Sequence, residues 1–167
     1  MPNTTQPAPI RKLIATIGLP GAGKTTWALN EIAKDPTGLT CRANRDALRI
    51  AHAGRRLGTG KQEAVVTDAQ MAMIRSAFEN GYNVVIVDDT NLNGVGRLQT
   101  LARDLGVTFA VKDFRASVTV ETCIRRDSAR QDKEPVGRTV IERMHTKSIL
   151  PWLRARAAEH ARTAAHA

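Results

Sequence analysis

Apolar residues fall into short runs that alternate with longer amphipathic segments along this chain. The short runs predict β-strands at residues 12–17, 39–43, 83–87 and 107–114. Apolar residues at helical spacing predict helices at residues 26–34, 44–53, 62–80 and 93–105, which lie between and around the strands. Three further helical segments, at about residues 118–129, 137–148 and 151–163, make the last part of the chain entirely helical.

The order of these elements predicts the fold class. Strands and helices that alternate at this spacing favour a three-layer α/β sandwich, with a parallel sheet of four or five strands and a helical C-terminal lid region. The unbroken valine and isoleucine run at residues 84–87 is typical of a central parallel strand buried on both faces. Ligands of such folds bind at the carboxyl ends of the strands.

Composition and charge indicate the size of the domain and the class of its binding partner. The chain has 167 residues, 42% of them hydrophobic, which suits one domain over residues 11–167. Residues 1–10 are polar and contain prolines, and we expect a disordered tail there. A net charge of +9 indicates a polyanionic partner, although solvated arginines on helix faces can supply part of it.

The sequence shows no long apolar segment that predicts a signal peptide or a membrane span. Cys41 and Cys123 have no metal-ligand spacing, and we expect both to be reduced in a cytoplasm. The expected location is therefore the cytoplasm of a bacterial or phage-infected cell.

The stretch GLPGAGKTT after the first strand matches the spacing of a phosphate-binding P-loop. Lys24 is placed to contact the β- and γ-phosphates of ATP, and the Thr25 hydroxyl to bind Mg²⁺. The remaining loop residues would surround the phosphates with backbone amides, and Thr26 would add a further donor; they are Gly18, Leu19, Pro20, Gly21, Ala22 and Gly23. A glycine-rich turn that binds nothing has no need for Lys-Thr at this position.

A carboxylate and an arginine follow the second strand. Asp46 and Arg49 are three residues apart and share one helical face. Asp46 is a candidate general base, because phosphoryl transfer is largely dissociative and the base need only orient a hydroxyl and take its proton late. Asp46 could instead stabilise the helix N-terminus and pair with Arg49.

Two more polar clusters follow later strands. Asp89, after the central strand, is a candidate to hold Mg²⁺ through water or to orient a basic side chain, while Asn93 is predicted to cap the next helix. The roles of Asp88 and Asp89 could be exchanged. In the third cluster, Arg126 and Arg130 are four apart on a predicted helical lid and could neutralise the transferring phosphoryl group. They could also be solvated helix arginines.

These motifs together resemble the kinase domain of phage polynucleotide 5′-hydroxyl kinases, within the wider P-loop phosphotransferases that include zeta-toxin-like proteins. The likeness extends over about residues 13–150 and joins GLPGAGKTTWA, NRDALR, DDTNLN and RRDSAR in one order. It implies that Asp46 is the general base, that Arg49 contacts an acceptor phosphate, and that Asp89, Arg126 and Arg130 belong to the active site.

The sequence departs from that family in two ways. Ala47 stands where the family often has a second Asp, and the chain has no DxDGT phosphatase motif. We therefore expect a kinase without a 3′-phosphatase partner domain.

The functional expectation is an ATP- and Mg²⁺-dependent kinase that phosphorylates the 5′-hydroxyl end of DNA or RNA during end healing. Arg49, Asp46, Asn91 and the basic loop residues Arg55 and Arg56 are the candidate acceptor-binding residues. The alternatives are a small-molecule kinase acting on a nucleoside, sugar or antibiotic, and a non-catalytic nucleotide-gated module that binds nucleic acid. The choice between DNA and RNA and the oligomeric state stay open.

Overall fold

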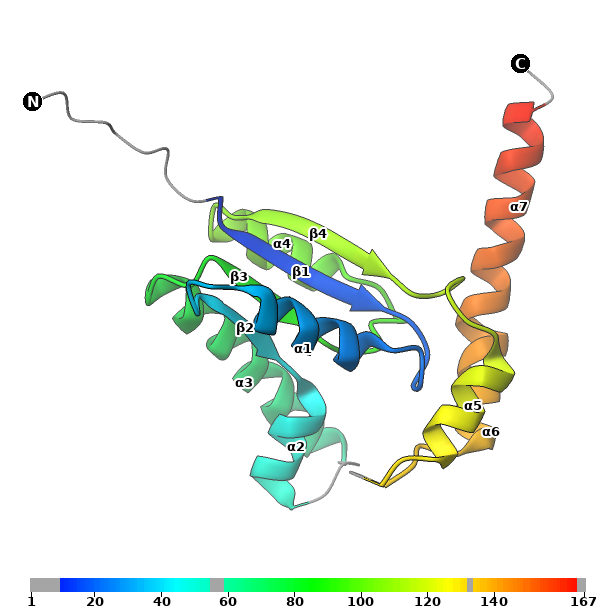
Figure 1. The fold of residues 1–167 in the computed structure, drawn as a ribbon, viewed down its shortest axis with the longest axis horizontal. Helices are drawn as coiled ribbons and strands as arrows, with labels where there is room; N and C mark the ends of the chain where they lie inside the picture. The colour runs from blue at the N-terminus through cyan, green and yellow to red at the C-terminus, as the bar shows by residue number, and fades with distance from the viewer. Residues whose placement is uncertain (1–9, 55–58, 132–133, 165–167) are drawn as a thin grey trace, which may run out of the picture.

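A parallel sheet forms the centre of the molecule (Figure 1). The structure is a computed structural model that describes residues 10–54, 59–131 and 134–164. Within these residues the sheet has four strands in the order β2-β3-β1-β4, all parallel to their neighbours. The strands are β1 (Lys12–Ile17), β2 (Thr40–Ala43), β3 (Val84–Val87) and β4 (Thr108–Asp113). The predicted α/β class with a parallel sheet is confirmed.

Helices cover both faces of this sheet (Figure 1). On one face, Ile74 and Phe78 of α3 (Gly60–Glu79) and Leu98 and Leu101 of α4 (Gly96–Asp104) pack in one core cluster with the odd-numbered residues of β1 and β3. Helix α1 (Lys24–Lys34) lies on the other face. Residues 85–87 of β3 are fully buried, as the unbroken apolar run predicted.

Side chains tie the central strands together at their carboxyl ends. The hydroxyl of Thr16, which is fully buried in β1, donates to the carbonyl oxygens of Val87 and Asp89 at 3.2 and 2.9 Å. In return, the Asn91 amide donates to the Thr16 carbonyl at 2.8 Å, and the Gly18 N–H donates to the Thr90 carbonyl. The loop after β3 is therefore fixed against the end of β1, where the P-loop begins.

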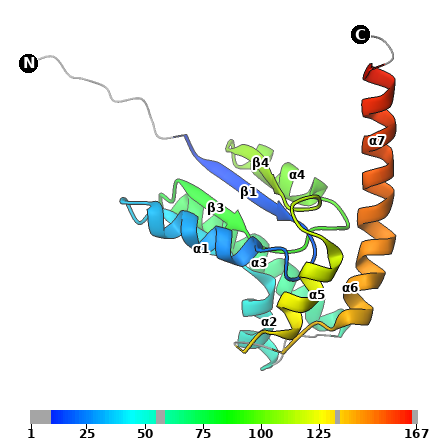
Figure 2. The same ribbon diagram turned by 45° about the vertical axis from the view of Figure 1, so that its right-hand side comes forward.

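The C-terminal helices form a second packed unit beside the P-loop (Figure 2). They are α5 (Val120–Ser128), α6 (Arg138–Met144), a π-helical turn η1 (His145–Ile149) and α7 (Leu150–Ala164). Leu19 and Ala22 of the P-loop share a core cluster with Cys123, Ile124, Ile141 and Ile149 of this unit. Beyond its first turns, α7 extends away from the sheet.

Most predicted boundaries differ from the observed ones by one to three residues, and two of the differences change an interpretation. The break expected before Pro151 is absent, because α6, η1 and α7 follow one another directly, and the wider turn carries the chain past a residue that lacks an N–H. The predicted helix start at Asn93 is also wrong. Helix α4 begins at Gly96, and its N-terminal cap position is Val95, so Asn93 does not cap it.

Some predictions concern residues that the structure does not describe. Arg55, Arg56 and residues 1–9 of the expected tail lie outside the described ranges. In the described ranges, no helix has the length and apolar character needed to cross a bilayer.

Candidate functional site

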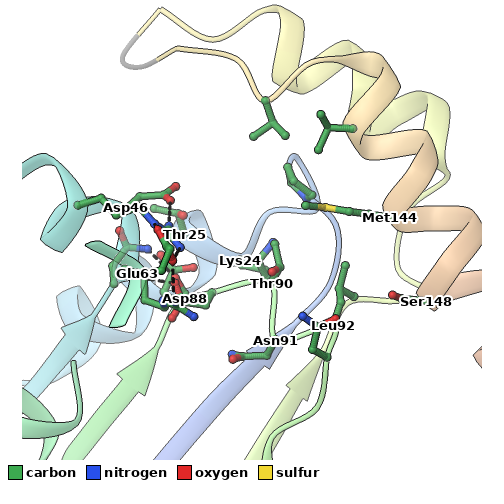
Figure 3. Close-up of a pocket in the computed structure, with 18 of the residues that line it drawn as sticks. Lys24, Thr25, Asp46, Glu63, Asp88, Thr90, Asn91, Leu92, Met144 and Ser148 are labelled. Carbon is green, nitrogen blue, oxygen red and sulfur yellow. Dashed lines mark hydrogen bonds and ion pairs between the residues drawn. The ribbon is translucent and has the colours of Figure 1, made fainter. Parts of the chain in front are cut away.

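One cleft of about 700 Å³ opens at the carboxyl ends of the strands (Figure 3). The P-loop and α1 contribute one part of its wall, through Pro20, Lys24 and Thr25. Helices α2 (Arg45–Ala53) and α3 contribute a second part, and the segment that follows β3 forms the floor. The third part comes from α6 and η1. The P-loop, the Asp46 and Arg49 pair, and the segment with Asp88 and Asp89 therefore meet in one place.

The P-loop glycines have different structural roles. A Cβ atom on Gly21 would collide with the backbone carbonyl of Cys123, so a side chain there would separate the loop from α5. Gly23 lies at φ 97°, a left-handed conformation that favours glycine, and a Cβ atom there would meet nothing within 4 Å. Gly23 is also the residue before α1, where helix N–H groups have no partner within the helix. The loop thus leaves open space beside a helix N-terminus, which suits a phosphate group.

Lys24 points along the inside of this loop. Its side chain is 8% exposed, and its ammonium group donates to the carbonyl oxygens of Gly18 and Leu19 at 2.9 and 2.7 Å. Burial lowers the pKa of Lys24 to about 8, and the nearby Asp88 carboxylate opposes this shift. A charged group held by neutral carbonyls in a buried site is well placed to move onto a phosphate.

Asp46, Arg49 and Glu63 form an ion-pair cluster on the second part of the wall (Figure 3). Arg49 donates to the Asp46 carboxylate at 2.7 Å and to both carboxylate oxygens of Glu63 at 2.6 and 2.9 Å. Arg45 also donates to Glu63, at 2.7 Å. These hydrogen bonds lower the pKa of Glu63 and raise that of Arg49. The predicted pairing of Asp46 with Arg49 is present, and Glu63 is an additional member that the sequence analysis did not identify.

Asp89 fixes the start of α2, the helix that carries Asp46. One oxygen of its carboxylate accepts from the Arg45 backbone N–H at 3.1 Å, and the other accepts from the Gln70 amide at 2.6 Å. Burial raises the pKa of Asp89, while these hydrogen bonds oppose the shift. The side chain of Asn44 caps the same helix by accepting from the Ala47 N–H. Asp89 therefore sets the position of Asp46 relative to β3.

Asp88 faces the P-loop side of the same cleft. It is 2% exposed and accepts from Arg42 of β2 at 2.8 Å. Of the carboxylates near Lys24, Asp88 affects the pKa of that lysine most. Asp88, Asp89 and the Thr25 hydroxyl together line the cleft with oxygen atoms, the donors that Mg²⁺ prefers. Mg²⁺ usually takes one or two protein oxygens and completes its shell with water and phosphate, so this donor set fits the ion.

The two predicted lid arginines lie in different places. Helix α5 ends at Ser128, so Arg130 is beyond the helix and the expected common helical face does not exist. Arg130 lines the cleft and lies 3.8 Å from the buried Asp127 carboxylate, too far for a hydrogen bond. Arg126 is exposed, is not part of the cleft lining, and makes a long contact of 3.4 Å to the Gly21 carbonyl.

The structure also shows where the candidate residues Asn91 and Thr26 lie relative to the cleft. Asn91 lines the cleft, and its amide nitrogen donates to the Thr16 carbonyl, a contact that shapes the loop after β3. Thr26 is exposed and lies outside the cleft lining. The C-terminal part of the wall includes cleft residues that the sequence analysis did not single out, among them Val136, Val140, Arg143, Met144, Lys147 and Ser148. Their spacing of about four residues was a usable signal, although it indicates a helical face rather than a site.

Comparisons with known proteins identify a family and relatives of this chain. Residues 13–151 match the AAA_33 family, which is described as an AAA domain. The chain is 29% identical over 149 residues to a protein of Autographa californica nuclear polyhedrosis virus that carries the provisional name bifunctional polynucleotide kinase/RNA ligase. The alignment covers 83% of this chain and 21% of the viral protein, so the chain spans only a small part of that relative.

Solved structures share the fold. A chain of the Pnkp1/Rnl/Hen1 RNA repair complex superposes with a TM-score of 0.73 at 24% identity, over 92% of this chain and 48% of that chain. The Mycobacterium tuberculosis APS kinase CysC, in complex with AMPPNP and APS, superposes with a TM-score of 0.53 at 19% identity, over 72% of this chain and 70% of that one. At these identities the likeness concerns the fold alone.

The similarity to polynucleotide kinases that the motifs indicated is confirmed by the viral relative. The family match extends over most of the chain and includes the P-loop, the Asp46 cluster and the Asp89 loop. The chain therefore belongs to the AAA_33 family of AAA domains and has a P-loop kinase-like fold.

Proposed function

We propose that this chain is an ATP- and Mg²⁺-dependent kinase that transfers the γ-phosphate of ATP to the 5′-hydroxyl end of DNA or RNA. The observation that carries the proposal is the placement of Asp46 in the same cleft as Lys24 and Thr25. A carboxylate close to a phosphate-binding loop is what a hydroxyl acceptor needs, since the acceptor has a proton to lose and the donor has negative charge to be neutralised.

The donor side of the reaction uses the P-loop. The N-terminus of α1 and the space at Gly23 receive the phosphates, and Lys24 exchanges its two carbonyl partners for phosphate oxygens. Thr25, with Asp88 and Asp89 beside it, would hold Mg²⁺, which would supply positive charge close to the transferring phosphate. Arg130, which has only a loose ion pair with Asp127, can turn toward the transferring group.

The acceptor side uses the α2 part of the wall. Asp46 accepts a hydrogen bond from the 5′-hydroxyl and orients its oxygen toward the γ-phosphorus. As the new bond from that oxygen to phosphorus forms and the bond from phosphorus to the β-bridging oxygen breaks, the hydroxyl proton passes to Asp46. Arg49 holds the Asp46 carboxylate in place through the 2.7 Å hydrogen bond between them.

The choice of a polymer acceptor rests on two observations. The chain carries a net charge of +9, and its viral relative is named as a polynucleotide kinase/RNA ligase. A small-molecule kinase would use the same P-loop and carboxylate, and the APS kinase shares the fold. A module that only binds nucleotide and nucleic acid would leave the acceptor unmodified.

The proposal is tested by incubating the protein with ATP labelled on its γ-phosphate and a panel of acceptors. The panel contains 5′-hydroxyl and 5′-phosphate oligonucleotides of DNA and RNA, nucleosides, nucleoside 3′-monophosphates, adenosine phosphosulfate and sugars. We expect label only on 5′-hydroxyl oligonucleotides and, more slowly, on nucleoside 3′-monophosphates. The 5′-phosphate oligonucleotides are the matched controls. Preferred labelling of a sugar or a nucleoside would favour the small-molecule kinase, and the absence of label on every acceptor would favour the binding module.

A further inference from the structure

The wall formed by α6 and η1 faces the cleft with an alternation of apolar and basic side chains. Val140 and Met144 line the cleft at a spacing of four residues, as do Arg143 and Lys147. Figure 3 shows Met144 and Ser148 on this wall, on the side of the view opposite Asp46 and Glu63. The motifs of the sequence and the mechanism above leave Arg143 and Lys147 without a role.

The residues of α6 and η1 that reach the cleft follow the spacing of one helical face, with two successive residues from each of two turns. An α-helix has 3.6 residues per turn, so residues four apart drift steadily around its surface. Over a single turn that drift is small, so Arg143 and Lys147, like Met144 and Ser148, line the cleft together, and the π-helical turn at His145–Ile149 does not interrupt this face. The turn therefore extends the basic face of α6 along the cleft.

The cations of the two walls differ in their partners. On the α2 wall, Arg45 and Arg49 are engaged by Glu63 and Asp46. On the α6 wall, neither Arg143 nor Lys147 takes part in any ion pair or hydrogen bond among the residues that the structure describes. Two like charges four apart on one helix repel each other, so this pair is unfavourable until an anion binds.

The phosphates of ATP already have partners elsewhere. The P-loop offers Lys24, the N-terminus of α1 and the open space at Gly23, and Arg130 lies close to Lys24. An acceptor strand has internucleotide phosphates that continue away from its 5′-hydroxyl, and the Asp46 wall meets that strand with arginines already neutralised. Among the residues that the structure describes, Arg143 and Lys147 are cleft cations without an ion-pair partner, and they are placed to hold it.

We infer that Arg143 and Lys147 form a phosphate clamp that binds the backbone of the acceptor strand beyond its first nucleotide. The inference rests on the proposed function, since it assigns the acceptor subsite of that same cleft. The first nucleotide lies against Asp46, and the strand then crosses the cleft to α6 and η1. The contribution of the clamp to the affinity for the acceptor should depend on strand length and not on base sequence, because backbone contacts carry no sequence information.

The test measures binding separately from turnover. A fluorescent single-stranded 5′-hydroxyl decanucleotide is titrated, by anisotropy, with wild type, with the double variant Arg143→Gln/Lys147→Gln, and with the control Arg138→Gln/Arg154→Gln. The control removes the same net charge from exposed positions of the same helical segment that lie outside the cleft lining. Circular dichroism and thermal melting establish that all three proteins are folded.

We expect the clamp variant to bind the decanucleotide roughly tenfold more weakly than the control does. The slope of the logarithm of affinity against the logarithm of salt concentration should fall by about 1.4, or about 0.7 for each lost contact to a single strand. In the kinase assay, its KM for the decanucleotide should rise while the KM values for ATP and for a nucleoside 3′-monophosphate stay close to those of the control.

Equal affinities and salt slopes for the clamp variant and the control would overturn the inference, whether or not wild type is a kinase. A rise in the KM for ATP alone would also overturn it and would assign both cations to the donor. Failure of wild type to phosphorylate any oligonucleotide would overturn the proposed function. That result comes from the label-transfer assay, whereas the clamp is tested by anisotropy, so the two failures can be told apart.

Discussion

Replacing Lys24 by methionine should stabilise the folded protein while it abolishes phosphoryl transfer. The ammonium group is buried in the P-loop, and burial lowers its pKa from the ordinary value of 10.5 to about 8. At about 1.4 kcal/mol per pKa unit, the folded state disfavours the charged lysine by about 3 kcal/mol at neutral pH. Methionine has a similar length and no charge, so Lys24→Met should recover part of that free energy, reduced by the cost of leaving the Gly18 and Leu19 carbonyl oxygens without their donor.

The direction in which stability changes with pH follows from proton binding by Lys24 in the folded and unfolded states. The folded protein has the lower Lys24 pKa, so the unfolded chain binds more protons between about pH 8 and pH 10.5, and the stability of wild type rises with pH through that window. Below pH 8 both states are protonated and the cost of burial is fully present. The advantage of Lys24→Met should therefore be largest near pH 7 and should shrink above pH 8.

Urea unfolding and thermal melting measure the effect. For a chain of 167 residues, each 1 kcal/mol gained corresponds to a rise in Tm of about 2 to 4 °C, so the upper bound of about 3 kcal/mol corresponds to about 6 to 12 °C. The matched control is Lys34→Met in the same helix, where the side chain is 72% exposed and pairs with Glu31. That variant should change Tm little. ATP should raise the Tm of wild type and of the control, and should leave Lys24→Met unchanged.

The reasoning about the buried lysine would be refuted if Lys24→Met were no more stable than wild type at pH 7. It would also be refuted if its advantage were the same at pH 7 and pH 9.5. A Lys24→Met variant that retained near-normal turnover would instead eliminate the assignment of Lys24 to the transferring phosphate.

Three further predictions concern the other parts of the cleft. Asp46→Asn should lower turnover by about 10² to 10⁴ with little change in ATP binding, because the amide cannot accept the hydroxyl proton. Glu63→Gln should lower the free energy of unfolding by about 1 kcal/mol and raise the KM for an oligonucleotide, since Arg49 loses the charged partner that holds it. Arg130→Ala should lower kcat by roughly 10², and Arg126→Ala should change it much less, because only Arg130 lines the cleft.

The label-transfer and urea-unfolding assays can also contradict each of these three predictions. Turnover of Asp46→Asn within a few-fold of wild type would reduce that residue to a helix-stabilising role. Unchanged stability and unchanged KM in Glu63→Gln would mean that Arg49 needs no such partner. A larger loss in Arg126→Ala than in Arg130→Ala would show that the lid rearranges when substrates bind.

The sequence by itself determined the strands, the class of the sheet and the phosphate loop. These features are local, because a buried strand is an unbroken apolar run and the P-loop needs glycine and Lys-Thr at fixed spacing. Gly23 illustrates this, since its left-handed φ of 97° follows from a residue type visible in the sequence. The pairing of Asp46 with Arg49 was predictable for the same reason, as the two lie one turn apart on a single helix.

Only the tertiary structure decided which distant groups complete the site. Glu63 meets Arg49 because α3 packs beside α2, and Gln70 reaches Asp89 through the same packing. The helix that runs on through Pro151 depends on a π-helical turn, which no propensity of these residues indicates. Lys147 lies within that turn and lines the cleft, and the end of α5 at Ser128 places Arg130 beyond that helix. Helix phase and helix packing depend on the whole core, so charged side chains on helices are assigned to the cleft or to solvent only once the chain has folded.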